Sequence, residues 1–119
     1  MNRFIAWLVS RWNALFGRRA EPYRVVLVEG RFPALLHQRR IYILTEDGDP
    51  WEARFVCPCG CKQELDLNLL PDQRPTWTIT QDQEGIATIH PSVWRHVGCK
   101  SHFFVQNGVV NWCEERVRP

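Results

Sequence analysis

The sequence predicts a small, mainly β domain of the α+β class, and three observations carry this prediction. The chain has 119 residues, which is room for one domain, and its 45% apolar and 24% charged composition is typical of a globular protein. After residue 19, short runs of β-branched and aromatic residues alternate with Gly, Pro and Asx turn signals. A long helical periodicity occurs only in residues 1–19. We therefore expect an amphipathic basic helix over residues 1–19 and a β domain over residues 20–119.

The first segment, "MNRFIAWLVSRWNALFGRR", has an apolar stripe at helical spacing with its arginines off the stripe. The stripe consists of Phe4, Ile5, Leu8, Trp12, Leu15 and Phe16. The apolar run is too short to span a bilayer, and no small-residue cleavage site follows it. We expect the helix to dock on its own domain or on another subunit. A membrane-surface helix and a cleaved or disordered leader are the alternatives. The expected location of the protein is cytoplasmic, with association to a membrane surface as the alternative.

The β domain begins with "YRVVLVEG", residues 23–30, which is rich in β-branched residues and predicts a buried strand closed by Gly30. The Asp-Gly and Pro of "EDGDP" predict a turn, so residues 39–57 are expected to form a hairpin. In residues 63–70, leucines alternate with polar residues, which indicates a half-exposed strand ended by Pro71.

Four further strands are expected in the second half of the chain. Residues 76–80 and 85–90 form two short apolar runs around the polar "QDQEG". Residues 101–113 form two apolar arms around Asn107-Gly108, which is the strongest short hairpin signal in the chain.

The charge of the chain is unevenly distributed. The formal net charge is +2, but residues 1–19 contain four arginines and no acid, so the rest of the chain carries −2. The β domain therefore lacks the dense positive field that phosphate binding requires. Nucleic acid is therefore not expected to be the main partner.

Three of the five cysteines, Cys57, Cys59 and Cys61, stand in "CPCGC" at the end of an apolar run. Disulfides are disfavoured because the count is odd, no export signal is present, and neighbours two apart on a strand cannot bridge easily. A redox pair would usually be C-x-x-C, which is absent. Metal binding fits best, because Pro58 and Gly60 bend the backbone so that the thiolates converge.

A structural zinc ion needs four nitrogen or sulfur ligands, and "GCKSHF" supplies a second group. The predicted ligands of Zn²⁺ are Cys57, Cys59, Cys61 and Cys99. His102 is the main alternative ligand, Cys113 is a possible one, and iron is an alternative metal. A metal that joins segments so distant in sequence would close a long loop and stabilise a small β domain.

Two classes of function remain open from the residues alone. An enzyme could use a zinc-bound water, although thiolate-rich shells blunt the Lewis acidity of zinc. It could instead use Ser92 or Ser101 as nucleophile with His90, His96 or His102 as base. The alternative for Ser92 is a turn residue, and for Ser101 a hydroxyl that bonds the metal loop.

The second class is a non-catalytic binding module stabilised by zinc. Such a module could hold a protein partner by strand addition, with exposed tryptophans as anchors. The candidates for these anchors are Trp77, Trp94 and Trp112.

The ordered motifs "CPCGC", "HPSVW" and "GCKSHFFVQNGVVNWC" resemble a bacterial domain family of unknown function over roughly residues 40–113. The family pattern is C-x-C-G-C, a Pro-Ser element, C-[RK]-S-H-[FY] and an Asn/Gly-Val-x-Trp hairpin. The resemblance implies a small zinc-site protein, sometimes encoded beside ubiquitin-like conjugation genes, that processes or removes the ubiquitin-like protein. The implied positions are Cys57, Cys59, Cys61, Pro91, Ser92, Cys99, Ser101 and His102.

This chain departs from that pattern in two places. The usual Pro-Ser-Ile-Gly-Asn-Trp element reads "PSVWRHVG" here, so its aromatic residue is shifted, and the basic leader is not part of the pattern. We expect a peptidase of a ubiquitin-like pathway with His102, Ser101 and Ser92 as candidate catalytic residues. The non-catalytic module is the alternative.

Overall fold

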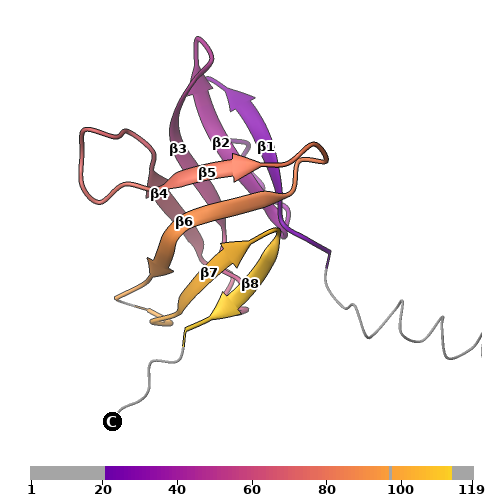
Figure 1. Cartoon of the computed structure of the whole chain (residues 1–119), viewed down its shortest axis with the longest axis vertical. Helices are drawn as coiled ribbons and strands as arrows, with labels where there is room; N and C mark the ends of the chain where they lie inside the picture. The colour runs from indigo at the N-terminus through magenta and orange to yellow at the C-terminus, as the bar shows by residue number, and fades with distance from the viewer. Residues whose placement is uncertain (1–20, 97, 114–119) are drawn as a thin grey trace, which may run out of the picture.

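The structure is a computed structural model that describes residues 21–96 and 98–113, and these residues form two four-stranded β-sheets (Figure 1). The first sheet has the order β1-β2-β3-β4 and the second β5-β6-β7-β8. The strands are β1 Arg24–Glu29, β2 Arg40–Glu46, β3 Asp49–Val56, β4 Glu64–Asn68, β5 Thr78–Gln81, β6 Ala87–Trp94, β7 His102–Gln106 and β8 Val109–Trp112. The prediction of a mainly β domain is confirmed. The helix predicted over residues 1–19 lies outside the described residues.

In the first sheet β1 is parallel to β2, and the other pairs are antiparallel. The predicted hairpin turn between β2 and β3 is present, with Asp47 and Gly48 at φ of 55° and 85°. In β4, Leu65 and Leu67 are buried and their neighbours are exposed or half-buried, as the alternation predicted. The strand predicted over residues 23–30 is present as β1, but the prediction that it is buried is wrong, because β1 is an edge strand and Leu27 is 60% exposed.

In the second sheet all pairs are antiparallel. The predicted turn at Asn107-Gly108 is present, and both residues have positive φ, at 50° and 78°. The predicted strand end at residue 90 is wrong, because β6 continues through Pro91 to Trp94. The pairing of β6 with β7 shifts register between Ile89 and Val93, so the strand carries a bulge at this point.

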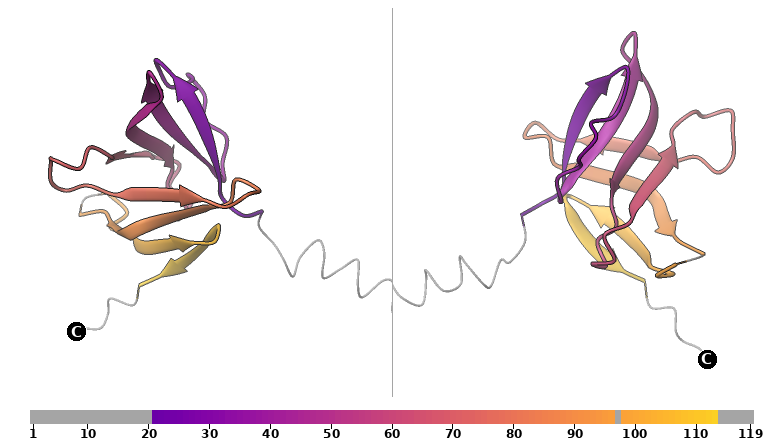
Figure 2. Two further views of the ribbon diagram at one scale, coloured as in Figure 1. Left: turned by 45° about the horizontal axis from the view of Figure 1, so that its top comes forward. Right: turned by 180° about the vertical axis from the view of Figure 1, so that it is seen from behind.

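The two sheets pack face to face around one apolar core, to which both contribute buried residues. The rings of Tyr23 and Phe103 both contact Phe55 edge to face, at centroid distances of 6.3 and 6.4 Å. At one corner, where the start of β1 meets the second sheet, main-chain hydrogen bonds join the two sheets, from Tyr23 N to Gly108 O and from Ala87 N to Tyr23 O (Figure 2). This corner therefore ties the start of β1 to the start of β6 and to the β7–β8 turn.

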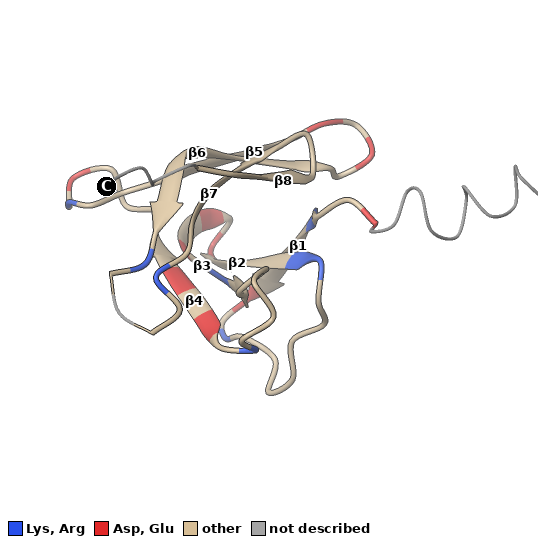
Figure 3. Cartoon of the chain, turned by 90° about the horizontal axis from the view of Figure 1, so that it is seen from below, with Lys and Arg blue, Asp and Glu red and all other residues tan. Residues whose placement is uncertain are grey.

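Basic and acidic residues are interspersed over the described part of the chain rather than gathered by sign, and β4 carries the acids Glu64 and Asp66 (Figure 3). The part of the chain that the structure describes contains no helix with the length and apolarity needed to cross a membrane.

Candidate active site and cysteine cluster

Four cysteines from two distant segments meet at one point. Cys57, Cys59 and Cys61 lie in the turn between β3 and β4, and Cys99 lies in the loop between β6 and β7. The four sulfur atoms lie within 4.8 Å of one another. The Sγ of Cys57 lies 3.5 Å from that of Cys59 and 3.6 Å from that of Cys99.

Residues with positive φ shape both loops of this cluster. Gly60 and Lys62 have φ of 99° and 68° in the first loop, and Gly98 and Lys100 have φ of 71° and 57° in the second. A left-handed backbone conformation reverses the chain sharply, and it is least strained where the residue is glycine. The expectation that Gly60 bends the thiol segment agrees with this geometry.

The two ends of the cluster differ in environment. Burial raises the pKa of the Cys57 thiol to about 12. The hydroxyl of Ser101, whose Oγ lies 3.1 Å from the Cys99 sulfur, lowers the pKa of Cys99 to about 6. The backbone N–H of Cys61 donates to the Cys59 sulfur and lowers the pKa of Cys59. A cation bound by these sulfurs would favour the thiolate form of all four, Cys57 included.

Arg95 adds a positive charge to the edge of the cluster, which no pattern in the sequence indicated. Its Nη1 donates to the sulfurs of Cys99 at 3.4 Å and Cys61 at 3.7 Å, and its Nη2 donates to Gln63 Oε1 at 2.9 Å. Arg95 therefore offsets negative charge on the thiolates and links the β3–β4 turn to the end of β6.

The sulfur set fits a tetrahedral metal ion. With Zn–S bonds of about 2.3 Å, tetrahedral geometry requires sulfurs about 3.8 Å apart, which is close to the two distances given above. A closed shell of four cysteines is typical of structural rather than catalytic zinc. Among the described residues, the group whose ligand atoms lie this close consists of these four cysteines and does not include His102 or Cys113, the alternative ligands. The Nε2 of His102 is hydrogen-bonded to Ser92 instead.

Ser92 and His102 form a hydrogen-bonded pair on neighbouring strands, with 2.9 Å between Ser92 Oγ and His102 Nε2. Ser92 lies in β6 within the bulge between Ile89 and Val93, and His102 is the first residue of β7. Both side chains are half-buried. A serine hydroxyl within hydrogen-bond reach of an imidazole nitrogen is the arrangement of a nucleophile and its general base.

Strand alternation separates the two candidate serines. Consecutive residues of a strand point to opposite faces, so Ser101 and His102 diverge although they are adjacent in sequence. Ser101 is buried beside the sulfurs of Cys99 and Cys57, at 3.1 and 4.0 Å. Ser92 reaches His102 across the sheet instead.

An aromatic side chain covers the histidine of this pair. The ring of Trp94 is stacked on His102, with 4.8 Å between centroids and 12° between planes. Trp94 also contacts the ring of His96, at 4.6 Å and 34°. Thus His96, which the sequence offered as an alternative base, lies against Trp94, while His90 is exposed where β6 pairs with β5.

Of the three tryptophans proposed as anchors, Trp94 and Trp112 are 52% and 51% exposed, and Trp77 is half-buried. The indole Nε1 of Trp77 donates to the main-chain carbonyl of Ser92 at 3.1 Å. No pattern in the sequence indicated this hydrogen bond or the stacking of Trp94 on His102. Both contacts depend on how β6 pairs with β5 and with β7.

Comparison with protein families gives a match over residues 28–113, well over half of the chain, to the family described as bacterial ubiquitination-like system serine protease (BubE). Comparisons with curated proteins and with solved structures gave no match. The predicted association with a bacterial ubiquitin-like system is confirmed at the level of the family, and the finer motif pattern stays a prediction. The chain belongs to the BubE family of serine proteases of bacterial ubiquitination-like systems.

Proposed function

We propose that this protein is a serine peptidase that cleaves the ubiquitin-like protein of its pathway from an attached group, with Ser92 as nucleophile and His102 as general base. The observation that carries the proposal is the 2.9 Å hydrogen bond between Ser92 Oγ and His102 Nε2. The family description, which names a serine protease, supports it independently.

The reaction follows the general course of serine acyl transfer. Ser92 Oγ attacks the scissile carbonyl as its proton passes to His102 Nε2. The tetrahedral intermediate then expels the leaving amine, which takes this proton from His102. Water hydrolyses the resulting ester of Ser92, with His102 again accepting and returning the proton. The face of Trp94 lies parallel to the imidazole and stabilises its cationic form during both steps.

The cysteine cluster has a structural role in this proposal. Cys57, Cys59, Cys61 and Cys99 would hold a zinc ion that pins the β3–β4 turn to the loop between β6 and β7. That loop leads directly into His102, so the pin fixes the base relative to Ser92. Ser101 supports the cluster through its hydrogen bond with the Cys99 sulfur and takes no part in proton transfer.

The test is cleavage of a fusion in which the ubiquitin-like protein of the same system carries a C-terminal reporter. We expect Ser92→Ala to lower the cleavage rate at least about a thousandfold, and His102→Ala to lower it strongly. Ser101→Ala is the matched control and should keep most of the activity.

Thermal unfolding of each variant separates loss of activity from loss of fold. Cleavage at the wild-type rate by Ser92→Ala would contradict the proposal. Loss of cleavage in a Ser101→Ala variant that remains folded would also contradict it.

A further inference from the structure

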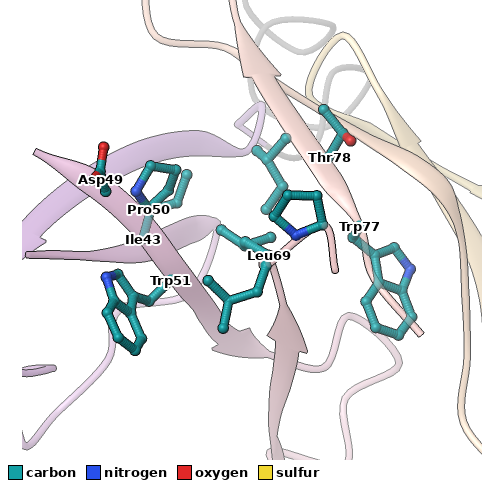
Figure 4. Close-up of a pocket in the computed structure, with 10 residues that line it drawn as sticks. Ile43, Asp49, Pro50, Trp51, Leu69, Trp77 and Thr78 are labelled. Carbon is teal, nitrogen blue, oxygen red and sulfur yellow. The ribbon is translucent and has the colours of Figure 1, made fainter. Parts of the chain in front are cut away.

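An apolar cleft lies beside the proposed nucleophile, between the first sheet and the start of β5. Its volume is about 590 Å³. Its lining is mostly apolar and includes Ile43, Pro50, Trp51, Leu69 and Trp77 (Figure 4). Asp49 is the one charged residue among the described residues that line it. A cleft of this size and polarity suits one large apolar side chain of a ligand.

Trp77 connects this cleft to Ser92. The indole lines the cleft and at the same time donates to the Ser92 carbonyl at 3.1 Å. One indole side chain therefore separates the cleft from the nucleophile's main chain. This span corresponds to roughly two residues of an extended peptide, at about 3.3 Å per residue.

A second, smaller cleft of about 260 Å³ lies on the other side of Trp77, and it is lined by β4 and by the end of β6. It includes Val93 and Trp94, which directly follow Ser92 in β6. The two clefts share Trp77, whose indole is hydrogen-bonded to the main chain of Ser92, so a ligand that extends from one cleft to the other along β4 would run close to the proposed nucleophile.

The edge of β4 that faces this path can pair with an extended chain. Hydrogen bonds from Cys57 N to Gln63 O and from Leu69 N to Trp51 O direct the odd-numbered main-chain groups of this segment toward β3. The main-chain groups of Glu64 and Asp66 therefore face outward, and β4 is the last strand of its sheet. Such an edge is a template for strand addition by a peptide.

We propose that the substrate binds as an extended peptide along β4 and places a large apolar side chain, about two residues from the scissile bond, in the cleft between Trp51 and Trp77. This inference rests on the proposed function. Trp51, 44% exposed, supplies one wall of the cleft and has no role in the chemistry at Ser92.

The test uses nonapeptides of glycine and serine in which one phenylalanine is placed at each position in turn, with the cleaved bond identified by mass spectrometry. We expect cleavage to be about tenfold faster or more when the phenylalanine lies at one fixed distance from the cleaved bond. Trp51→Ala should remove this preference. Leu27→Ala, an exposed apolar residue on the opposite edge of the same sheet, is the matched control and should keep it.

Hydrolysis of p-nitrophenyl acetate, which has no side chain to bind, reports on the chemistry alone and should be equal in the wild type, Trp51→Ala and Leu27→Ala. Suppose that ester hydrolysis by the wild type depends on Ser92. The inference is then overturned by any one of three results: no peptide is cleaved, the position of the phenylalanine has no effect on the rate, or the preference for one position survives in Trp51→Ala. If Ser92→Ala hydrolyses the ester as the wild type does, the proposed function itself fails, and the inference fails with it.

Discussion

At the scale of single residues, the candidate site depends on the face of a strand to which each side chain points. Ser92 and His102 share a face across two strands and are hydrogen-bonded, whereas Ser101 is directed to the sulfurs. The ring stacked on His102 belongs to Trp94, the residue paired with it in the register of β6 and β7. Each residue thus has a distinct role that its neighbour in sequence cannot take over.

Replacing Trp94 tests the contribution of this stacking. Trp94→Ala should lower kcat roughly two- to fivefold, because a cation–π contact at an exposed site contributes about 0.5–1 kcal/mol. Trp94→Phe should restore most of the loss. If steady-state kinetics show equal kcat for both variants and the wild type, the stacking does not assist the reaction.

At the scale of elements, the β7–β8 hairpin anchors one corner where the two sheets meet. Gly108 accepts from Tyr23 N and donates to Ala87 O, and it has positive φ. A Cβ at this position would lie 2.6 Å from Pro22 Cβ and 2.8 Å from Ile86 Cγ2. The close approach of the backbones therefore requires glycine for two separate reasons.

Gly108→Ala should accordingly lower the free energy of unfolding by about 2–4 kcal/mol, from left-handed strain and steric overlap together. Gly48→Ala is a suitable control, because Gly48 also has positive φ but a Cβ there meets nothing within 4 Å. Its cost should be only about 1–2 kcal/mol. Urea unfolding measures the loss in free energy of unfolding for both variants, and equal losses would show that the corner around Gly108 is not tightly packed.

Local signals made most elements predictable from the sequence. Asn107-Gly108 and Asp47-Gly48 specify their turns through backbone conformation alone, and the alternation of Leu65 and Leu67 specifies one face of β4. The spacing of the cysteines indicated a metal site for a similar reason, since Gly60 allows the bend that brings them together.

The pairing of Ser92 with His102 could not be chosen from the sequence, because it depends on the bulge in β6 and on its register with β7. Both are tertiary features. The same holds for Trp77, which directly precedes β5 and reaches Ser92 through the antiparallel pairing of β5 with β6.

At the scale of the whole molecule, the cysteine cluster joins the two sheets at the end that carries the candidate active site. Three cysteines follow β3 of the first sheet, and Cys99 precedes β7 of the second. A small two-layer β domain has a limited core, so a metal that joins its layers would contribute substantially to stability.

We therefore expect about one zinc ion per chain by elemental analysis of the purified protein. Chelation should lower Tm and the rate of hydrolysis in parallel, and added zinc should restore both. Cys59→Ser should lose zinc, whereas Cys113→Ser should keep it. A purified protein that lacks metal, or hydrolysis that chelation abolishes while Tm is unchanged, would contradict a structural zinc site.

The most direct test of the central claim, that Ser92 activated by His102 is the nucleophile, is covalent labelling with a fluorophosphonate followed by peptide mass spectrometry. The predicted result is one adduct on Ser92, strongly reduced in a folded His102→Ala variant. An adduct on Ser101 instead, or no adduct in a protein that cleaves its substrate, would contradict it.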